Sequence, residues 1–243
     1  MSKFVGILKW VVLLVYFPIM LAFVSKSHDS VICSEVNVIV KDSLSAGFVR
    51  ADDIRSSILD EYPNLLGGNV ADMNFNDMES FVNSFEAIRV TEVYNSGTGA
   101  LNVVVQQHEP ILRVFGKEGT FYLDENGNKL PVSSLFSAHV IVASGNIPEE
   151  KGELIDLAKK LVHDPFWSAQ MEQIYIRRNN DYILVPRVGD HLILLGKPID
   201  IDKKLRNLKV LYTRGLEPKE WNEYREINLK YTNQVICSRE RSL

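Results

Sequence analysis

The chain has 243 residues, a net charge of −4 and no run of Lys or Arg longer than a pair. Nucleic-acid binding needs a basic face that neutralises phosphates, so this composition argues against a nucleic-acid partner. The two cysteines, Cys33 and Cys237, are too few for a disulfide scaffold or a zinc site. In an oxidising compartment they either pair or stay separate thiols, and their spacing does not decide between the two.

The first predicted element is the apolar segment Phe4–Val24, in which Lys9 is the only charge. A helix of this length, at about 1.5 Å per residue, crosses the roughly 30 Å hydrocarbon core of a bilayer. A cleaved signal peptide is the alternative, but the long apolar run and the poor cleavage site at residues 25–27 favour a retained anchor. Lys3 and Lys9 favour a cytoplasmic N-terminus and an exported bulk.

A β-α-α-β-β pattern follows the apolar segment. Alternating apolar residues predict the strands, and apolar residues at helical spacing predict the helices. The second helix begins with a cap at Asn74 or Asn76. The predicted elements are a strand at Ser34–Lys41, a helix from Asp52 to Pro63, a helix at Asp77–Phe85, and strands at Ile88–Tyr94 and Ala100–Gln107. The pattern indicates a small self-contained domain.

Pro110 marks the start of a second predicted domain, which is rich in hairpins. Asn126-Gly127 is a strong two-residue hairpin signal. The predicted helices are Glu149–His163 and Asp200–Tyr212. The predicted strands are Ile111–Phe115, Gly119–Leu123, Lys129–Val132, Val140–Ala143, Gln173–Arg178, Tyr182–Pro186, His191–Leu195 and Glu226–Ser238. The exported part is therefore expected to be α+β, in two domains.

The sequence predicts no catalytic residue, no metal site and no cofactor. It contains no GxSxG, GxxxxGK or GxGxxG motif, and its five histidines lack the i, i+4 spacing of metal sites. The pair His163-Asp164 fits a base with its orienter, but a polar helix end is the favoured interpretation. Asp124–Asn128 lacks the Glu that a calcium loop needs at its twelfth position, which favours a plain turn.

The last predicted strand, Glu226–Ser238, places Ile227, Leu229 and Tyr231 on one face. At a sheet edge its backbone would receive a partner strand, whereas an interior strand would already be paired. The stretch Tyr231–Cys237 has neither the charge nor the proline that usually blunts an edge. The pattern alone leaves both positions open.

Four features together make the chain resemble the FtsQ/DivIB family of bitopic cell-division proteins. The first is a short tail and single anchor followed by a β-α-α-β-β module like the POTRA domain of that family. The others are the strand exit Val103–Ile111 (VVVQQHEPI), the hairpin Phe121–Lys129 (FYLDENGNK), and the helix from Lys203 followed by the strand Glu226–Tyr231 (EINLKY). Asn228 and Lys230 depart from the family pattern, which usually has Asp and Arg there.

The resemblance implies a single-pass protein of the bacterial inner membrane, with its bulk in the periplasm at the division septum. The implied parts are a cytoplasmic tail at 1–3, an anchor in the lipid bilayer at 4–24, a POTRA-like domain at 33–109, a β domain at 110–238 and a tail at 239–243.

The implied function is that of a non-catalytic scaffold that binds FtsB-like and FtsL-like partners and helps control septal peptidoglycan synthesis. No small-molecule substrate is expected. In the family the FtsB partner adds a strand at the end of the β domain. The residues carried over as partner-binding are Leu229, Tyr231, Thr232, Asn233, Gln234 and Val235.

Two other functions fit part of the pattern. One is a membrane-anchored periplasmic enzyme whose site is assembled from His139, His163 and Asp164, against which the absent motifs argue. The other is a POTRA-containing export component. Such components usually carry several POTRA units or a β-barrel, and neither fits the rest of the chain.

Overall fold

The computed structural model describes residues 10, 12–20, 31–41, 47–133, 136–217 and 221–239. They form two compact units, one built around Val49–Gln107 with β1, the other from His108 onward together with residues 47–48. Residues 12–20 are helical, and the rest of the predicted anchor except residue 10 lies outside the described residues. Among the residues that the structure describes, no helix is long and apolar enough to cross a bilayer.

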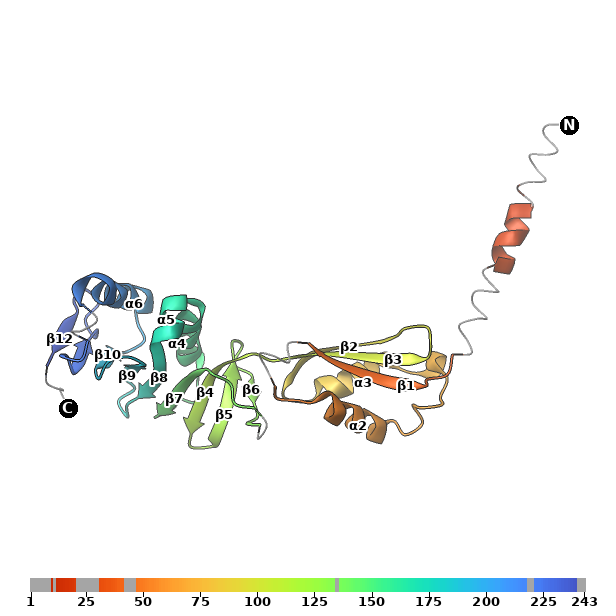
Figure 1. The fold of residues 1–243 in the computed structure, drawn as a ribbon, viewed down its shortest axis with the longest axis horizontal. Helices are drawn as coiled ribbons and strands as arrows, with labels where there is room; N and C mark the ends of the chain where they lie inside the picture. The colour runs from red at the N-terminus through yellow and green to blue at the C-terminus, as the bar shows by residue number, and fades with distance from the viewer. Residues whose placement is uncertain are drawn as a thin grey trace. The chain divides into compact units, whose positions relative to one another are not determined.

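The first unit is a three-stranded sheet with two helices on one face (Figure 1). Its central strand, β3, runs parallel to β1 and antiparallel to β2. Its elements are β1 (Glu35–Lys41), α2 (Ala51–Glu61), the 3-10 turn η1 (Val70–Asp72), α3 (Phe75–Asn83), β2 (Ile88–Asn95) and β3 (Ala100–Gln107). The predicted β-α-α-β-β order is confirmed, with η1 added between the helices.

Helix α3 begins two residues before its predicted start because Asn74 is the cap. The Asn74 side-chain oxygen accepts the backbone N–H of Asp77 at 3.4 Å, so Asn76 lies inside the helix. Both helices bury a narrow apolar stripe that joins the strand residues in one core. The fully or nearly fully buried residues of the two stripes are Ile54, Ile58, Met78 and Val82.

The second unit is a nine-stranded mixed sheet in the order β12-β11-β10-β9-β8-β7-β4-β5-β6, with its helices on one face (Figure 1). Its first strands are β4 (Pro110–Gly116), β5 (Gly119–Asp124), β6 (Lys129–Leu130) and β7 (Ile141–Gly145). The remaining strands are β8 (Met171–Ile176), β9 (Tyr182–Pro186), β10 (Leu192–Gly196), β11 (Glu226–Asn228) and β12 (Ile236–Ser238). Its helices are α4 (Gly152–His163), α5 (Pro165–Gln170) and α6 (Ile201–Val210), the last continued by the π-turn η2 (Leu211–Gly215).

Helix α5 is absent from the sequence prediction. Asp164 caps it by accepting the N–H of Phe166 at 2.9 Å, and Pro165 fills the first helical position, where its missing N–H costs nothing. The short helix buries Trp167, 2% exposed, in the same core as the apolar stripe of α4. The Asp-Pro pair was the available signal, and a six-residue helix is too short to show periodicity.

The prediction of one long strand at Glu226–Ser238 is wrong, because the segment contains two short strands and a turn. The Leu229 N–H still bonds the Leu194 carbonyl at 2.9 Å. The next N–H, that of Lys230, is taken by the Asn228 side chain at 3.0 Å. Such a local bond competes with the sheet ladder and ends the strand. As a result β11 is interior, while β12 lies at the edge of the sheet.

Candidate partner-binding edge

The C-terminal end of the nine-stranded sheet combines an edge strand with a structured turn. β12 pairs antiparallel with β11 and is the last strand in the sheet order. Ile236 in this strand is 45% exposed, whereas Val235 and Cys237 pack against the core. A short edge strand with an exposed aliphatic residue is able to receive another strand through its backbone.

The turn between β11 and β12 contains all six predicted partner-binding residues. Leu229 is buried, 1% exposed, and anchors the start of the turn in the core. Tyr231 is 60% exposed, and its carbonyl accepts the N–H of Gln234 at 3.3 Å. The predicted residues are therefore gathered in one place, but Leu229 supports the surface instead of forming it.

Helix α6 and its preceding residue hold this turn by three polar contacts. The Asn207 side chain donates to the Thr232 carbonyl at 3.0 Å. The Lys203 ammonium donates to the Asn233 side-chain oxygen at 2.7 Å. The Thr232 hydroxyl donates to the Asp200 carboxylate at 3.2 Å. These contacts hold the backbone that follows Tyr231 against α6.

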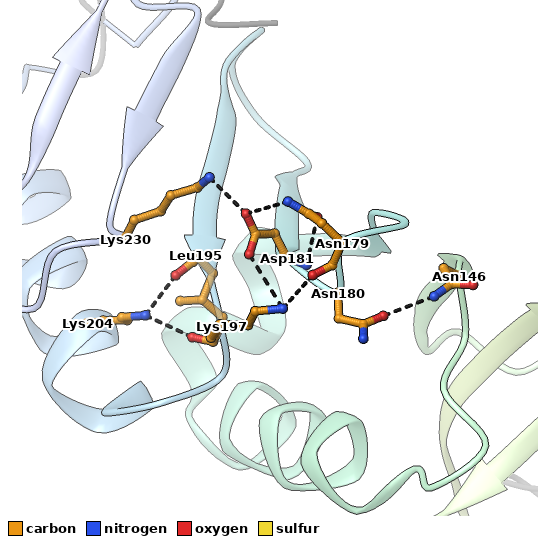
Figure 2. A network of polar contacts seen from close by, with 8 residues as sticks. All are labelled: Asn146, Asn179, Asn180, Asp181, Leu195, Lys197, Lys204 and Lys230. Carbon is orange, nitrogen blue, oxygen red and sulfur yellow. Dashed lines mark hydrogen bonds and ion pairs between the residues drawn. The ribbon is translucent and has the colours of Figure 1, made fainter.

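A charged network fixes the other side of the turn (Figure 2). The Lys230 ammonium donates to Asp181 in the β8–β9 turn at 2.8 Å, and the Lys197 ammonium lies 4.0 Å from the same carboxylate. The Asp181 side chain is 13% exposed and also accepts from the Asn179 amide at 3.1 Å. The hydrogen bond from Lys230 lowers the pKa of Asp181, and burial opposes that shift only in part.

Lys204 is a buried cation beneath this network. It is 4% exposed, and its ammonium donates to the carbonyls of Leu195 and Lys197 at 2.8 and 2.9 Å (Figure 2). Burial lowers the pKa of Lys204. The sequence held a signal for this position, because Lys204 lies three residues after Ile201, on the apolar stripe of α6. Lys204 thus satisfies two backbone carbonyls at the C-terminal end of β10.

A buried aromatic cluster ties η2 to the segment that leads into β11. The His191 side chain, 1% exposed, hydrogen-bonds the Tyr212 hydroxyl through Nε2, and its Nδ1 lies 3.2 Å from the Trp221 carbonyl. Burial lowers the pKa of His191, so the imidazole is neutral near pH 7. Burial also raises the pKa of Tyr212. The cluster therefore joins η2, the start of β10 and the segment before β11 through buried contacts.

The residues proposed for an enzymatic site have other roles. His163 lies 2.7 Å from Glu125, and Asp164 pairs with Lys209 at 2.8 Å besides capping α5. Both line a groove of about 400 Å³, which exposed His139 does not line. In the described part of the chain, no group of three or more His, Cys, Asp or Glu residues is placed to hold a metal ion.

The two cysteines are free, and they lie in different units. Cys33 is buried in the first unit and Cys237 is half-buried in β12. Of the two alternatives that the sequence left open, the structure therefore has separate thiols.

Two family models cover the two units. A model described as "FtsQ/DivIB, C-terminal related" matches residues 109–238, more than half of the chain. The chain belongs to the FtsQ/DivIB family. A POTRA-like domain model matches residues 31–106 of this FtsQ/DivIB protein. No curated protein matches the chain in a sequence search.

Membership in the FtsQ/DivIB family gives the protein a role in cell division, among the proteins of the divisome at the division septum. The family is one of non-catalytic scaffolds. The C-terminal related region of this FtsQ/DivIB protein contains the whole candidate edge, from Asp181 to β12. The candidate site therefore lies in the part of the chain by which the family is recognised.

Proposed function

We propose that this protein is a divisome scaffold that binds FtsB-like and FtsL-like partners in the periplasm and thereby helps control septal peptidoglycan synthesis. An FtsB-like partner adds a strand to the outer edge of β12 and covers Tyr231. The chain positions its partners and performs no chemistry itself.

One observation carries this proposal: an exposed tyrosine sits on a rigid turn beside a sheet edge. Tyr231 is 60% exposed, while the backbone on either side is held by Lys230–Asp181 and by the contacts of α6. Pre-ordering of the turn reduces the entropy lost on binding. Backbone pairing along β12 would set the register of the partner, and the Tyr231 ring would supply an anchor.

A membrane anchor at residues 4–24 completes the proposal. The described part of this segment, residues 10 and 12–20, is helical and carries exposed apolar side chains, such as Leu14 at 71% and Phe17 at 62%. Exposed apolar side chains around a helix favour a lipid environment. We expect the tail at residues 1–3 in the cytoplasm and the two units in the periplasm of a bacterial inner membrane.

Photo-crosslinking in cells tests where the partner binds. A photoreactive residue at Tyr231 should crosslink to a small bitopic coiled-coil protein. The same probe at Tyr94, which is 47% exposed on β2 of the first unit, is the matched control and should not. Crosslinks of this partner to Tyr94 alone would overturn the assignment of the edge.

Affinity measurements test what the tyrosine contributes. Complete burial of a large apolar side chain is worth about 1.5–3 kcal/mol, and Tyr231 has 60% of its surface left to bury. Tyr231→Ala should therefore weaken partner binding by about 1–2 kcal/mol, roughly 5- to 30-fold. Tyr94→Ala should leave the affinity unchanged. Hydrogen exchange should slow in the complex at those β12 amides whose N–H groups point away from β11, which are alternate residues of the strand. Unchanged exchange throughout β12 would refute strand addition.

A further inference from the structure

The helical layer of the first unit carries a concentrated negative charge. Residues 49–86 contain eight acidic and two basic side chains, a net charge of −6, whereas the whole chain has −4. Within the described residues this layer has one ion pair, between Arg55 and Asp52 at 3.7 Å. Most of its carboxylates are exposed, and among the described residues only Asp52 is paired with a cation, so the layer creates a field that attracts cations.

A groove of about 500 Å³ opens in this layer, where the end of α2 meets η1 and the start of α3. Its volume is in the range of sites that bind ligands. Its floor is apolar: Leu65 and Met78 are buried, and Tyr62 and Met73 are half-buried. Methionine side chains adapt their shape to different apolar partners, which suits a peptide-binding floor.

All charged residues that line this groove are acidic. Glu61, Asp72 and Asp77 line it, all three are exposed, and its lining contains no Lys, Arg or His. Burial raises the pKa of Tyr62, and the nearby charges of Glu61 and Asp77 add to that effect. The phenol therefore experiences the same negative field as a ligand in the groove would.

We propose that this acidic groove binds a short segment of a partner protein in which apolar residues alternate with Lys or Arg. The apolar side chains would contact the methionines and Tyr62, and the cations would lie beside the rim carboxylates. Anionic lipid and nucleic acid are repelled by the same field. In the described part of the chain, these carboxylates do not form a cluster suited to a metal ion. This surface lies in the first unit and does not depend on the strand-addition proposal.

Methionine methyl groups offer a direct readout of occupancy. The chain has five methionines, of which Met73 and Met78 line the groove, while Met171 is fully buried in the second unit. The full chain with isotope-labelled methionine methyls is titrated with a peptide of alternating lysine and leucine. We expect saturable shifts of Met73 and Met78, with Met171 unchanged. A peptide of alternating lysine and glycine has the same charge and should bind at least tenfold more weakly.

Matched charge variants test whether the rim is responsible. Glu61→Gln with Asp72→Asn removes two rim charges, and it should weaken the lysine–leucine peptide by about three- to tenfold. Asp60→Asn with Glu86→Gln removes two exposed charges of the same layer outside the groove, and affinity should stay within about twofold.

Several outcomes would overturn the proposal. Equal weakening by both double variants would mean that the peptide responds to diffuse charge. Equal binding of the lysine–glycine peptide would mean that the apolar floor is not used. Saturable shifts of Met73 and Met78 on addition of calcium alone, stronger than those with peptide, would assign the groove to a cation. Shifts that depend on protein concentration without peptide would assign it to a second copy of the chain.

Discussion

Asp181→Asn should destabilise the second unit and do so in a pH-dependent way. The substitution keeps the size of the side chain and an oxygen acceptor, but it removes the negative charge that faces Lys230 at 2.8 Å. The Lys230 ammonium then remains beside a neutral amide, with Lys197 also nearby. The change therefore isolates the electrostatic part of the network that holds the turn between β11 and β12.

The magnitude follows from how deeply the pair is buried. The Asp181 side chain is 13% exposed and that of Lys230 is 36% exposed. Exposed pairs contribute about 0–1 kcal/mol, and removal of one partner from a fully buried pair costs about 3–5 kcal/mol. Because the lysine end is partly screened by water, we expect a loss of about 1–2 kcal/mol, or roughly 2–8 °C in Tm.

Urea unfolding followed by tryptophan fluorescence measures this loss, because Trp167 and Trp221 both lie in the second unit. The pKa of Asp181 is lowered in the folded state, so its contribution is fully present above the unfolded pKa of about 4. The difference between wild type and Asp181→Asn should be constant from neutral pH to about pH 5. It should shrink as the pH falls through the folded-state pKa of Asp181.

A double-mutant cycle with Lys230→Met separates the pair from its surroundings. If the pair is coupled, Lys230→Met should cost less in the Asp181→Asn background than in wild type. Additive losses, or a difference that stays the same down to pH 2, would refute this account of the network.

Three further predictions concern the stability of the second unit. The folded-state pKa of His191 is lowered, so the unfolded state takes up the proton first as the pH falls. Wild-type stability should therefore fall as the pH drops below about 6.5. His191→Gln should flatten that dependence in thermal melts from pH 7 to 5. Gly145 has φ +93°, and a Cβ there would lie 2.2 Å from the Ile176 carbonyl oxygen. Gly145→Ala should therefore lower the free energy of unfolding in urea by more than about 2 kcal/mol. A loss below about 0.5 kcal/mol would contradict this geometry. Leu154 is fully buried, and Leu154→Ala should cost about 2–5 kcal/mol in the same assay, with a smaller loss if the core collapses around the cavity.

Sequence patterns predicted the strands and helices that bury one face against a core. The alternation at Val36, Val38 and Val40 fixed β1, and the spacing of Leu154, Leu157 and Leu161 fixed α4, because these periods match the side that faces the core. Elements set by local polar contacts were harder to predict. The Asn228 bond to the Lys230 N–H divides the last strand, and the apolar alternation continues through the turn as though no break existed.

The sequence pointed to the residues of the β11–β12 turn, but not to the contacts that hold this turn in the structure. Tyr231 stands out in the sequence as an aromatic residue near the end of the chain, and the structure exposes it. The pairing of Lys230 with Asp181 joins residues 49 positions apart, and neither hydropathy nor local propensity contains that information. The buried position of Lys204 was present in the helical spacing, but a single lysine is normally expected at the surface.

The Lys230–Asp181 contact also has a consequence for how related sequences vary. A change at either position alone leaves a partly buried charge without its counter-ion, whereas loss of both charges together avoids that penalty. Selection should therefore act on the two positions as one unit. Relatives that carry a neutral residue in place of Asp181 should also lack a base in place of Lys230, so the β11–β12 turn and the β8–β9 turn are expected to covary.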